Sequence, residues 1–241
     1  MNDGLTISVC VATYNGEKYI REQLDSILAT LNDGDEIVVS DDGSSDGTMD
    51  ILRGYEENHP LRVVMGPRDG FSSNFGNAIA QARGDIVVFS DQDDIWAPNK
   101  LQVVREAFRD GQLTTLLHNM ATFRNNTLQD TAEIPMGYHA GVMRNFIKSS
   151  YWGCCMAVKR DFVRRFFPFR PHCVGHDQLI GLMSEAYGKT AYIDQKLIWH
   201  RLHQTNTSNH RTIKQMIDFR IELEKDYRFA KSKYLQGVRR K

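Results

Sequence analysis

Two acidic residues that follow an apolar run are the strongest chemical signal in the sequence. Asp91 and Asp93 come soon after the run at 86–89 and stand two positions apart. In an extended chain, residues with this spacing point to the same side, so the two carboxylates would converge. Hard oxygen ligands of this kind suit Mg²⁺ or Mn²⁺, which also bind phosphate oxygens. The alternative is a solvated acidic turn that caps the helix beginning near Pro98.

Other binding motifs fit these acidic segments only in part. The segment 42–47 matches the start of an EF-hand loop, but the twelfth position is Arg53, where that loop needs a glutamate. A phosphatase that forms an aspartyl-phosphate would need Thr or Val at the fifth position from Asp91, and the chain has Ile95 there. The sequence also lacks the G-x-G-x-x-G fingerprint of dinucleotide oxidoreductases. These differences exclude an EF-hand and weaken the other two interpretations.

The elements that would position the acidic segments alternate along the first half of the chain. Continuous apolar runs predict buried strands, and apolar residues at helical spacing predict helices between them. The expected strands are 7–12, 37–40, 61–65 and 86–89, and the expected helices are 20–31, one around 51–55, 72–83 and one after Pro98. This alternation indicates an α/β fold with a mostly parallel sheet, which binds ligands at the carboxyl ends of its strands. The polar segments at those ends are 13–17, 41–46 and 91–94.

The second half of the chain is less regular, but no linker separates it from the first. We expect a loop-rich stretch at 119–140, a buried strand at 151–158, a helix at 175–187 and a strand at 191–199. The absence of a Pro-, Gly- or Ser-rich linker predicts one domain over 1–209. Residues 210–241 form a basic tail, in which apolar residues recur at helical intervals over 211–236.

Composition is that of a soluble globular protein with unevenly distributed charge. The 241 residues are 41% hydrophobic and 25% charged, with 30 basic and 30 acidic residues. From His210 onward there are ten Lys or Arg and four Asp or Glu, a pattern expected of a catalytic body with an extension that binds anions. The balanced total charge gives no reason to expect nucleic acid. Without a signal peptide or a long apolar run, the chain is expected in the cytoplasm, with its four cysteines reduced.

Taken together, the polar segments resemble one enzyme family. They are VATYNGE at 11–17, VSDDGSSDGT at 39–48 and FSDQDDIW at 89–96, in the order and at the intervals of family 2 glycosyltransferases. Three further segments match the same pattern: GFSSNF at 70–75, GHDQ at 175–178 and WHRLH at 199–203. The resemblance implies a GT-A fold, which is a Rossmann-like sheet flanked by helices. Its nucleotide-binding half would cover about 1–110 and its acceptor half 111–209.

The resemblance assigns several residues to a nucleotide-sugar donor and its cation. The donor-binding residues would be Thr13, Asn15, Glu17, Asp42, Asn74, Asp91, Arg201 and His203. Asp42 would accept a hydrogen bond from the imide N–H of a pyrimidine base. Asp91, Asp93 and His203 would hold Mg²⁺ or Mn²⁺, and the cation would offset the charge on the departing nucleoside diphosphate.

On the acceptor side, the resemblance points to the start of the helix expected at 175–187. Asp177 would act as the general base that removes a proton from the acceptor hydroxyl, and direct displacement would invert the anomeric configuration. The alternative is that Asp177 is only the N-cap of a helix beginning near Gln178. His176 would contact the acceptor, or would instead be a packed neutral histidine. Many family members have Glu-Asp here, and the His-Asp version is similar to that of bacterial rhamnosyltransferase-like O-antigen or capsule enzymes.

The implied activity is metal-dependent transfer of one sugar from a UDP- or dTDP-linked donor to a glycan or lipid-linked acceptor in bacterial surface polysaccharide synthesis. The acceptor motif of processive synthases is absent, which favours a single transfer. A sugar nucleotidyltransferase is the first alternative, although the sequence lacks its early glycine-rich loop. A non-catalytic nucleotide- or glycan-binding module is the second. The basic tail would attach weakly to an anionic inner membrane surface, or else pack on the body or on a second subunit.

Overall fold

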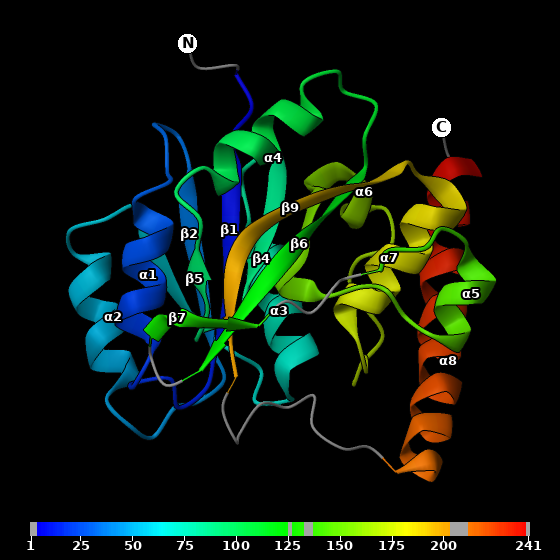
Figure 1. Cartoon of the computed structure of the whole chain (residues 1–241). Coiled ribbons are helices and arrows are strands. Elements are labelled where there is room, and N and C mark those ends of the chain that lie inside the picture. The colour runs from blue at the N-terminus through cyan, green and yellow to red at the C-terminus, as the bar shows by residue number, and fades with distance from the viewer. Residues whose placement is uncertain (1–3, 125–126, 133–136, 203–211, 240–241) are drawn as a thin grey trace.

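In the computed structural model, a mixed β-sheet is flanked by helices on both faces (Figure 1). The structure describes residues 4–124, 127–132, 137–202 and 212–239. Within these ranges the strand order is β3-β2-β1-β4-β8-β6-β9-β5, and β7 pairs with β6. No helix within the same ranges is both long enough and apolar enough to cross a membrane.

The first half of the chain builds the parallel part of the sheet, as predicted. Its elements are β1 (Ile7–Thr13), α1 (Ile20–Leu28), β2 (Glu36–Asp41), α2 (Thr48–Glu56), β3 (Leu61–Met65), α3 (Phe71–Gln81), β4 (Ile86–Ser90) and α4 (Lys100–Phe108). β1 pairs in parallel with β2 and β4, and β2 pairs in parallel with β3. Because Thr13 lies opposite Asp41 in this register, the loops that follow β1 and β2 leave the sheet at the same edge.

The second half contains several elements that the sequence did not predict. Its elements are β6 (Thr115–Arg124), β7 (Thr127–Ala132), α5 (Val142–Ile147), the 3₁₀ turn Gly153–Cys155, β8 (Met156–Lys159), α6 (Arg160–Arg164), α7 (His176–Tyr187), β9 (Thr190–Arg201) and α8 (Ile213–Arg239). The short strand β5 (Ile95–Trp96), which precedes α4, was not predicted either. The predictions of α7, β9 and α8 are confirmed. The expectation of a loop-rich stretch at 119–140 is wrong across β6 and β7, and the strand expected at 151–158 begins only at Met156.

Pairing in this half also differs from the parallel arrangement of the first half. β6 pairs in parallel with β9 but antiparallel with β7 and β8, and β8 pairs antiparallel with β4. β6 escaped prediction because buried polar residues, among them His118 and Asn119, interrupt its apolar run. The mostly parallel arrangement therefore describes β3-β2-β1-β4, beyond which the sheet is mixed.

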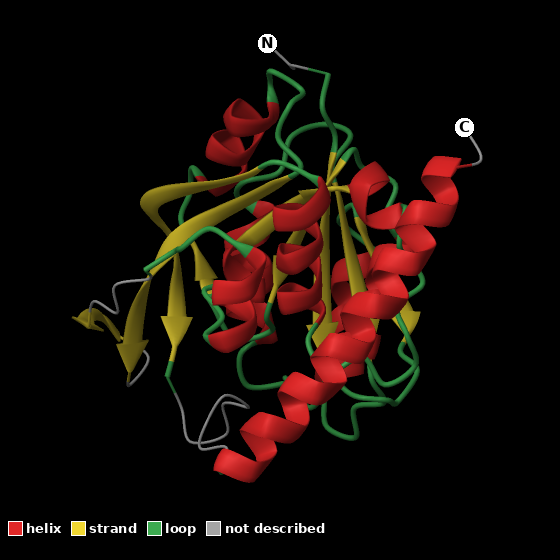
Figure 2. Cartoon of the chain, turned by 90° about the vertical axis from the view of Figure 1, so that its right-hand side faces the viewer, coloured by secondary structure: helices red, strands yellow, loops and turns green. Residues whose placement is uncertain are grey.

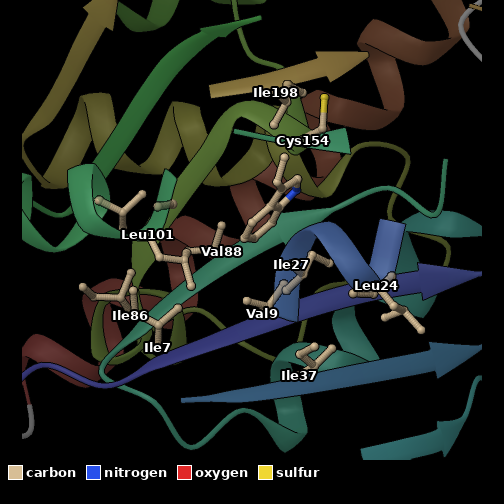
Figure 3. Close-up of a cluster of buried hydrophobic side chains, with 14 of the residues drawn as sticks. Ile7, Val9, Leu24, Ile27, Ile37, Ile86, Val88, Leu101, Cys154 and Ile198 are labelled. Carbon is tan, nitrogen blue, oxygen red and sulfur yellow. The ribbon is translucent and has the colours of Figure 1, made fainter. Parts of the chain in front are cut away.

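Alternation of side chains along β1 and β4 supplies two apolar layers. Val9 and Val88 point to the face covered by α1, α2 and α4, where they meet Ile27 and Leu101 (Figure 3). Cys10 points to the opposite face, which α3, α6, α7 and α8 cover. Strands buried on both faces read as continuous apolar runs, which is why the first four could be found in the sequence.

Candidate active site

The loop after β1 is tied to the loop after β2 by side-chain hydrogen bonds. Thr13 is buried and donates its hydroxyl to Oδ2 of Asp41 at 2.8 Å. The carboxamide oxygen of Asn15 and the carboxylate of Glu17 accept backbone N–H groups of the second loop, at 2.8 and 2.9 Å. Thr13, Asn15 and Glu17, which the resemblance assigns to donor binding, therefore also hold the loops after β1 and β2 together.

Asp41 and Asp42 have different partners although they are adjacent. Asp41 is fully buried and accepts hydrogen bonds from the backbone N–H of Ser44, at 2.8 Å, and from its hydroxyl, at 2.6 Å. Asp42 is half-buried and accepts the backbone N–H groups of Arg68, at 2.7 Å, and Gly70, at 3.0 Å. Asp42 thereby joins the loop after β3 to the same edge, while its contact with a pyrimidine base stays a prediction.

The loop after β3 comes so close to this edge that it requires a glycine. A Cβ on Gly66 would lie 2.5 Å from Oδ1 of Asn74 and 2.8 Å from Oδ1 of Asp42. Asn74, on α3, donates its amide to the carbonyl of Thr13 at 3.2 Å. Within the described ranges, Oδ1 of Asn74 is buried without a hydrogen-bond partner. Sequence reasoning found Asn74 but not Gly66, because contact between distant loops leaves no local pattern.

Four side chains meet at the acidic loop after β4, and we call them the acidic cluster. Asp91, Asp94, Cys154 and His200 each offer a ligand atom, and these atoms lie within 4.8 Å of one another. Asp94 accepts a hydrogen bond from Nδ1 of His200 through its Oδ1 at 2.8 Å. Its Oδ2 is buried and has no hydrogen-bond partner in the described part of the chain. The carboxylate oxygens of Asp91 and Asp94 fit a divalent cation, and the buried free oxygen of Asp94 supports that fit.

Burial and crowded charge control protonation in the acidic cluster. Burial, followed by the carboxylates of Asp94 and Asp93, raises the pKa of Asp91 to about 8. Burial alone would lower the pKa of His200, but the adjacent Asp94 carboxylate outweighs it and the net shift is upward. A divalent cation at these carboxylates would favour the ionised form of Asp91 and lower its pKa again.

Asp93 and Arg201 have other contacts in this structure. The backbone carbonyl of Asp93 accepts a hydrogen bond from Nε of Arg201 at 2.9 Å. Arg201 is only 2% exposed, pairs with Glu22 and lies 4.5 Å from the centre of the Phe123 ring. Its guanidinium therefore supports the acidic loop from the protein interior. A donor contact by Arg201 and a metal bond by Asp93 stay predictions, and His203 lies outside the described residues.

Helix α7 begins beside the acidic cluster. A Cβ on Gly153, in the turn that carries the cysteine of the cluster, would lie 3.2 Å from the His176 ring and 3.6 Å from Cβ of Asp177. After burial and nearer charges, the charge of Asp177 also raises the pKa of Asp91. The helix begins at His176 with Gly175 as its N-cap, so Asp177 lies within the first turn and is not the N-cap.

His176 lies in the apolar layer between α3 and β4. Its ring stacks on Phe75 with a centroid distance of 4.2 Å and meets Phe89 edge-on at 5.3 Å. The residue is 3% exposed, and neither ring nitrogen has a hydrogen-bond partner within the described residues. Burial lowers the pKa of His176 to about 3, so the ring is neutral. These properties match the alternative of a packed neutral histidine, and a contact with the acceptor stays a prediction.

Sequence reasoning missed three members of the acidic cluster and one bridging residue. Asp94 and His200 lie within segments that carried the resemblance, whereas Cys154 has no informative spacing. Gln92 accepts the backbone N–H of Tyr14 at 2.9 Å and donates to its carbonyl at 3.1 Å. This pair of bonds joins the loop after β1 to the acidic loop, and the D-x-D spacing alone contains no sign of it.

Comparisons with known proteins bear on the family and the fold of the chain. Residues 8–167 match the sequence profile described as Glycosyl transferase family 2. The chain is 26% identical over 213 residues to the uncharacterized glycosyltransferase alr2836 of Nostoc sp. (strain PCC 7120), covering 84% of this chain and 66% of that protein. It is 27% identical over 216 residues to the dTDP-rhamnosyl transferase RfbG of Shigella flexneri, covering 81% and 72%. The chain thus spans just under two thirds of the length of the Nostoc relative.

Two solved structures share the fold. S. aureus TarS 1-349 in complex with UDP-GlcNAc has a TM-score of 0.72 at 20% identity, over 97% of this chain and 72% of that one. The mannosyltransferase PcManGT from Pyrobaculum calidifontis, in complex with GDP-Man and Mn²⁺, has a TM-score of 0.63 at 18% identity, over 96% and 74%. Identities this low show the fold alone, and they confirm the expected GT-A architecture. Because the family profile covers more than half of its residues, the chain belongs to glycosyltransferase family 2.

Proposed function

We propose that the chain catalyses the inverting, metal-dependent transfer of a single sugar from a UDP- or dTDP-linked donor to a hydroxyl group. The observation that carries the proposal is the close approach of the acidic cluster to the start of α7. Gly153 precedes Cys154 of the cluster, and a Cβ on Gly153 would lie 3.6 Å from Cβ of Asp177. Inverting transfer needs these two functions together, a cation site for the leaving group and a base for the acceptor.

Asp177 is the proposed general base. It accepts the proton of the acceptor hydroxyl while the hydroxyl oxygen bonds to the anomeric carbon of the donor. The bond from that carbon to the phosphate oxygen breaks at the same time, and attack from the opposite face inverts the configuration. Asp91 and Asp94, with Asp93 on the same loop, would hold Mg²⁺ or Mn²⁺, which when bound offsets the negative charge of the nucleoside diphosphate.

The donor is proposed to be a pyrimidine nucleoside diphosphate sugar. Asp42 would accept the imide N–H of the base, and Thr13, Asn15, Glu17 and Asn74 would line the nucleotide pocket. RfbG is named as a dTDP-rhamnosyl transferase and TarS was solved with UDP-GlcNAc, which supports this choice. PcManGT was solved with GDP-Man, so discrimination between pyrimidine and purine nucleotides is part of the test.

The acceptor is proposed to be a glycan or a lipid-linked glycan of a bacterial surface polysaccharide, used at the inner face of the cell membrane. Helix α8 supports this proposal, since four large apolar residues of its first turns are exposed, whereas Leu223, Ala230 and Tyr234 further along are buried against the body. The exposed residues are Ile213, Met216, Ile217 and Ile221, with 50–78% of each exposed. Such a face would lie in a lipid interface, and nearby lysine and arginine residues would favour an anionic surface.

The proposed reaction is tested by incubating the protein with UDP- and dTDP-sugars and glycan acceptors, with and without Mn²⁺, and assigning the product linkage by NMR. Wild-type protein is expected to form a product of inverted configuration only with the cation present. Asp177→Asn is expected to lower turnover by about 10²–10⁴-fold, the usual contribution of general acid–base catalysis, with UDP affinity retained. A retained configuration, or an Asp177→Asn variant with the wild-type rate, would contradict the mechanism.

A further inference from the structure

A pocket with aromatic side chains in its lining lies beside the loop that leads into α7 and the proposed base. Its volume is about 370 Å³. It is an open pocket lined by the end of the loop after β3, the start of α3, the loop before α7 and the first turns of α8. Its lining includes Asp69, Phe71, Ser72, His172, Gln215 and Phe219.

One glycine connects this pocket to the proposed base. A Cβ on Gly175 would lie 3.2 Å from Cζ of Phe219 and 3.5 Å from Oδ1 of Asp177. The aromatic edge and the carboxylate therefore approach the same point of the loop from two sides. The backbone N–H of His176 also donates to Oγ of Ser72 at 3.2 Å, which joins the start of α7 to the α3 wall of the pocket.

Hydrogen bonds tie together the elements that line this pocket. Nη1 of Arg220 donates to Oε1 of Gln178 at 2.8 Å and ties the first half of α8 to α7. The backbone N–H of Val174 donates to the buried carboxylate of Asp226 at 3.0 Å, which ties the loop before α7 to α8. The placement of Phe219 therefore follows from the docking of α8, which Figure 2 shows crossing in front of the other helices on its face of the sheet.

The chemistry of the walls points to a sugar ring. Phe71 is 47% exposed and Phe219 is half-buried, so both offer aromatic surface to the pocket. Polar groups surround these rings, since His172 and Asp69 pair at 2.6 Å and Gln215 lies on the α8 side. A pyranose has apolar C–H faces and a rim of hydroxyl groups, and its surface is complementary to aromatic walls with a few polar groups.

We infer that this pocket binds a pyranose unit of the acceptor and that Phe219 of α8 determines which acceptor is used. The inference rests on the proposed function, because it assumes that Asp177 is the base which the acceptor hydroxyl must reach. The nucleotide is expected at the loops after β1, β2 and β3. Asp69 of the loop after β3 also lines the pocket, so a sugar bound there would lie next to the donor as well as to the proposed base. Helix α8 is thereby a part of the acceptor site as well as a cover for the sheet.

The test uses the full chain, Mn²⁺, and octyl glycosides of glucose, galactose, N-acetylglucosamine and rhamnose as acceptor probes. Binding of each glycoside is followed by saturation-transfer NMR, and release of nucleoside diphosphate from UDP-GlcNAc, UDP-glucose and dTDP-rhamnose reports transfer. Phe219→Ala is expected to weaken glycoside binding and raise its KM about 3- to 10-fold, the value of one aromatic contact. Phe219→Tyr is expected to restore wild-type binding. Phe229→Ala removes the same side chain further along α8, beneath Lys233, and is expected to change neither quantity.

The outcomes separate this inference from the proposed function. Wild-type glycoside binding by Phe219→Ala would overturn the inference, as would failure of the wild-type protein to bind any of the four glycosides. If glycosides bind and Phe219→Ala weakens their binding, but no donor releases its nucleoside diphosphate, the inference about the pocket is supported and the proposed glycosyl transfer is contradicted. UDP affinity, measured on every variant, reports whether the donor half is folded.

Discussion

Asp41 and Asp42 are neighbours in the chain, yet their carboxylates bond to different loops at the end of β2. The Asp41 carboxylate is fully buried and organises the turn that follows it. The Asp42 carboxylate is half-buried and receives the backbone of the loop after β3. Loss of the first is therefore expected to affect folding, and loss of the second to affect the nucleotide pocket.

Asp42→Ala is expected to weaken UDP binding about 10- to 100-fold, because a hydrogen bond to a charged group contributes about 1.5–3 kcal/mol. Isothermal titration with UDP in Mn²⁺ measures the effect. Asp50→Ala is the matched control, since that carboxylate is exposed and pairs only loosely with Arg53, at 3.8 Å. Equal affinity of the wild-type protein for UDP and ADP would contradict recognition of a pyrimidine.

The buried ring of His176 should make stability depend on pH. Its pKa is about 3 in the folded protein, below the value of about 6.5 expected when unfolded, so between these values only the unfolded state binds the proton. Folding is therefore expected to lose stability as pH falls from 6.5 toward 3. His176→Phe keeps a ring against Phe75 and removes the titration. Urea unfolding at pH 7 and pH 5 should show a loss about 2 kcal/mol larger for wild type, and equal losses would disprove a neutral buried imidazole.

At the scale of elements, the sheet edge consists of loops that hold one another. The loop after β1 bonds to the loop after β2, which in turn bonds to the loop after β3. Gln92 links the first of them to the acidic loop. Since each loop is positioned by the next, a change in one loop is expected to disturb the donor site as a whole.

Gly66→Ala tests this interdependence. The added Cβ would lie 2.5 Å from Oδ1 of Asn74 and 2.8 Å from the carbonyl of Asp41, so the loop after β3 must shift and lose its bonds to Asp42. We expect about 1–3 kcal/mol lower stability and weaker UDP binding. Gly54→Ala, on α2, is the control, because its Cβ would have no described atom within 4 Å and should add about 0.5–1 kcal/mol of stability. Thermal unfolding and UDP titration measure both variants. A Gly66→Ala variant with wild-type stability and UDP affinity would contradict the interdependence of the loops.

At the scale of the whole molecule, α8 has two parts with different surroundings. Leu223, Ala230 and Tyr234 are buried against the body, and Arg170 pairs with the buried Asp226 at 2.6 Å. The expectation that the tail packs on the catalytic body thus holds for this part of the helix. Its first turns expose an apolar stripe, and the same turns carry the pocket residues Gln215 and Phe219. A lipid-linked acceptor could then place its sugar in the pocket and its lipid in the membrane beside the stripe.

Replacement of Ile217 and Ile221 by serine is expected to reduce co-sedimentation with vesicles of phosphatidylcholine and phosphatidylglycerol. Both residues are at least half exposed, so the folded body should tolerate the change. High salt should weaken wild-type binding too, since each basic residue near the surface contributes about 1 kcal/mol that salt screens. Serines at Leu235 and Val238, exposed at the other end of α8, are the control and should leave binding unchanged. Wild-type sedimentation by the Ile217 and Ile221 variant would exclude this stripe as the membrane contact.

The sequence by itself determined the parallel half of the sheet and the polar edge that faces the ligand. Strands buried on both faces need continuous apolar runs, and the polar residues directly after them must lie at the carboxyl edge. Both signals are local, so β1, β2, β3 and β4 could be read from one chain. The 3.6-residue spacing of α7 and α8 is local as well. By contrast, β6 was hidden because buried polar residues such as His118 and Asn119 interrupt its apolar run.

Only the tertiary structure decided which acidic residues join the cluster and which charged residues are buried behind it. Asp94 joins the acidic cluster because His200 and Cys154 approach it from β9 and from the 3₁₀ turn, which lie far away in the sequence. Arg201 is buried behind the acidic loop for the same reason. Residue type and spacing indicate the chemistry that a side chain can perform. Its burial, its hydrogen-bond partners and its pKa depend on segments that meet only after folding. The pocket at Phe219 is the clearest case, since its walls come from three elements that no sequence interval connects.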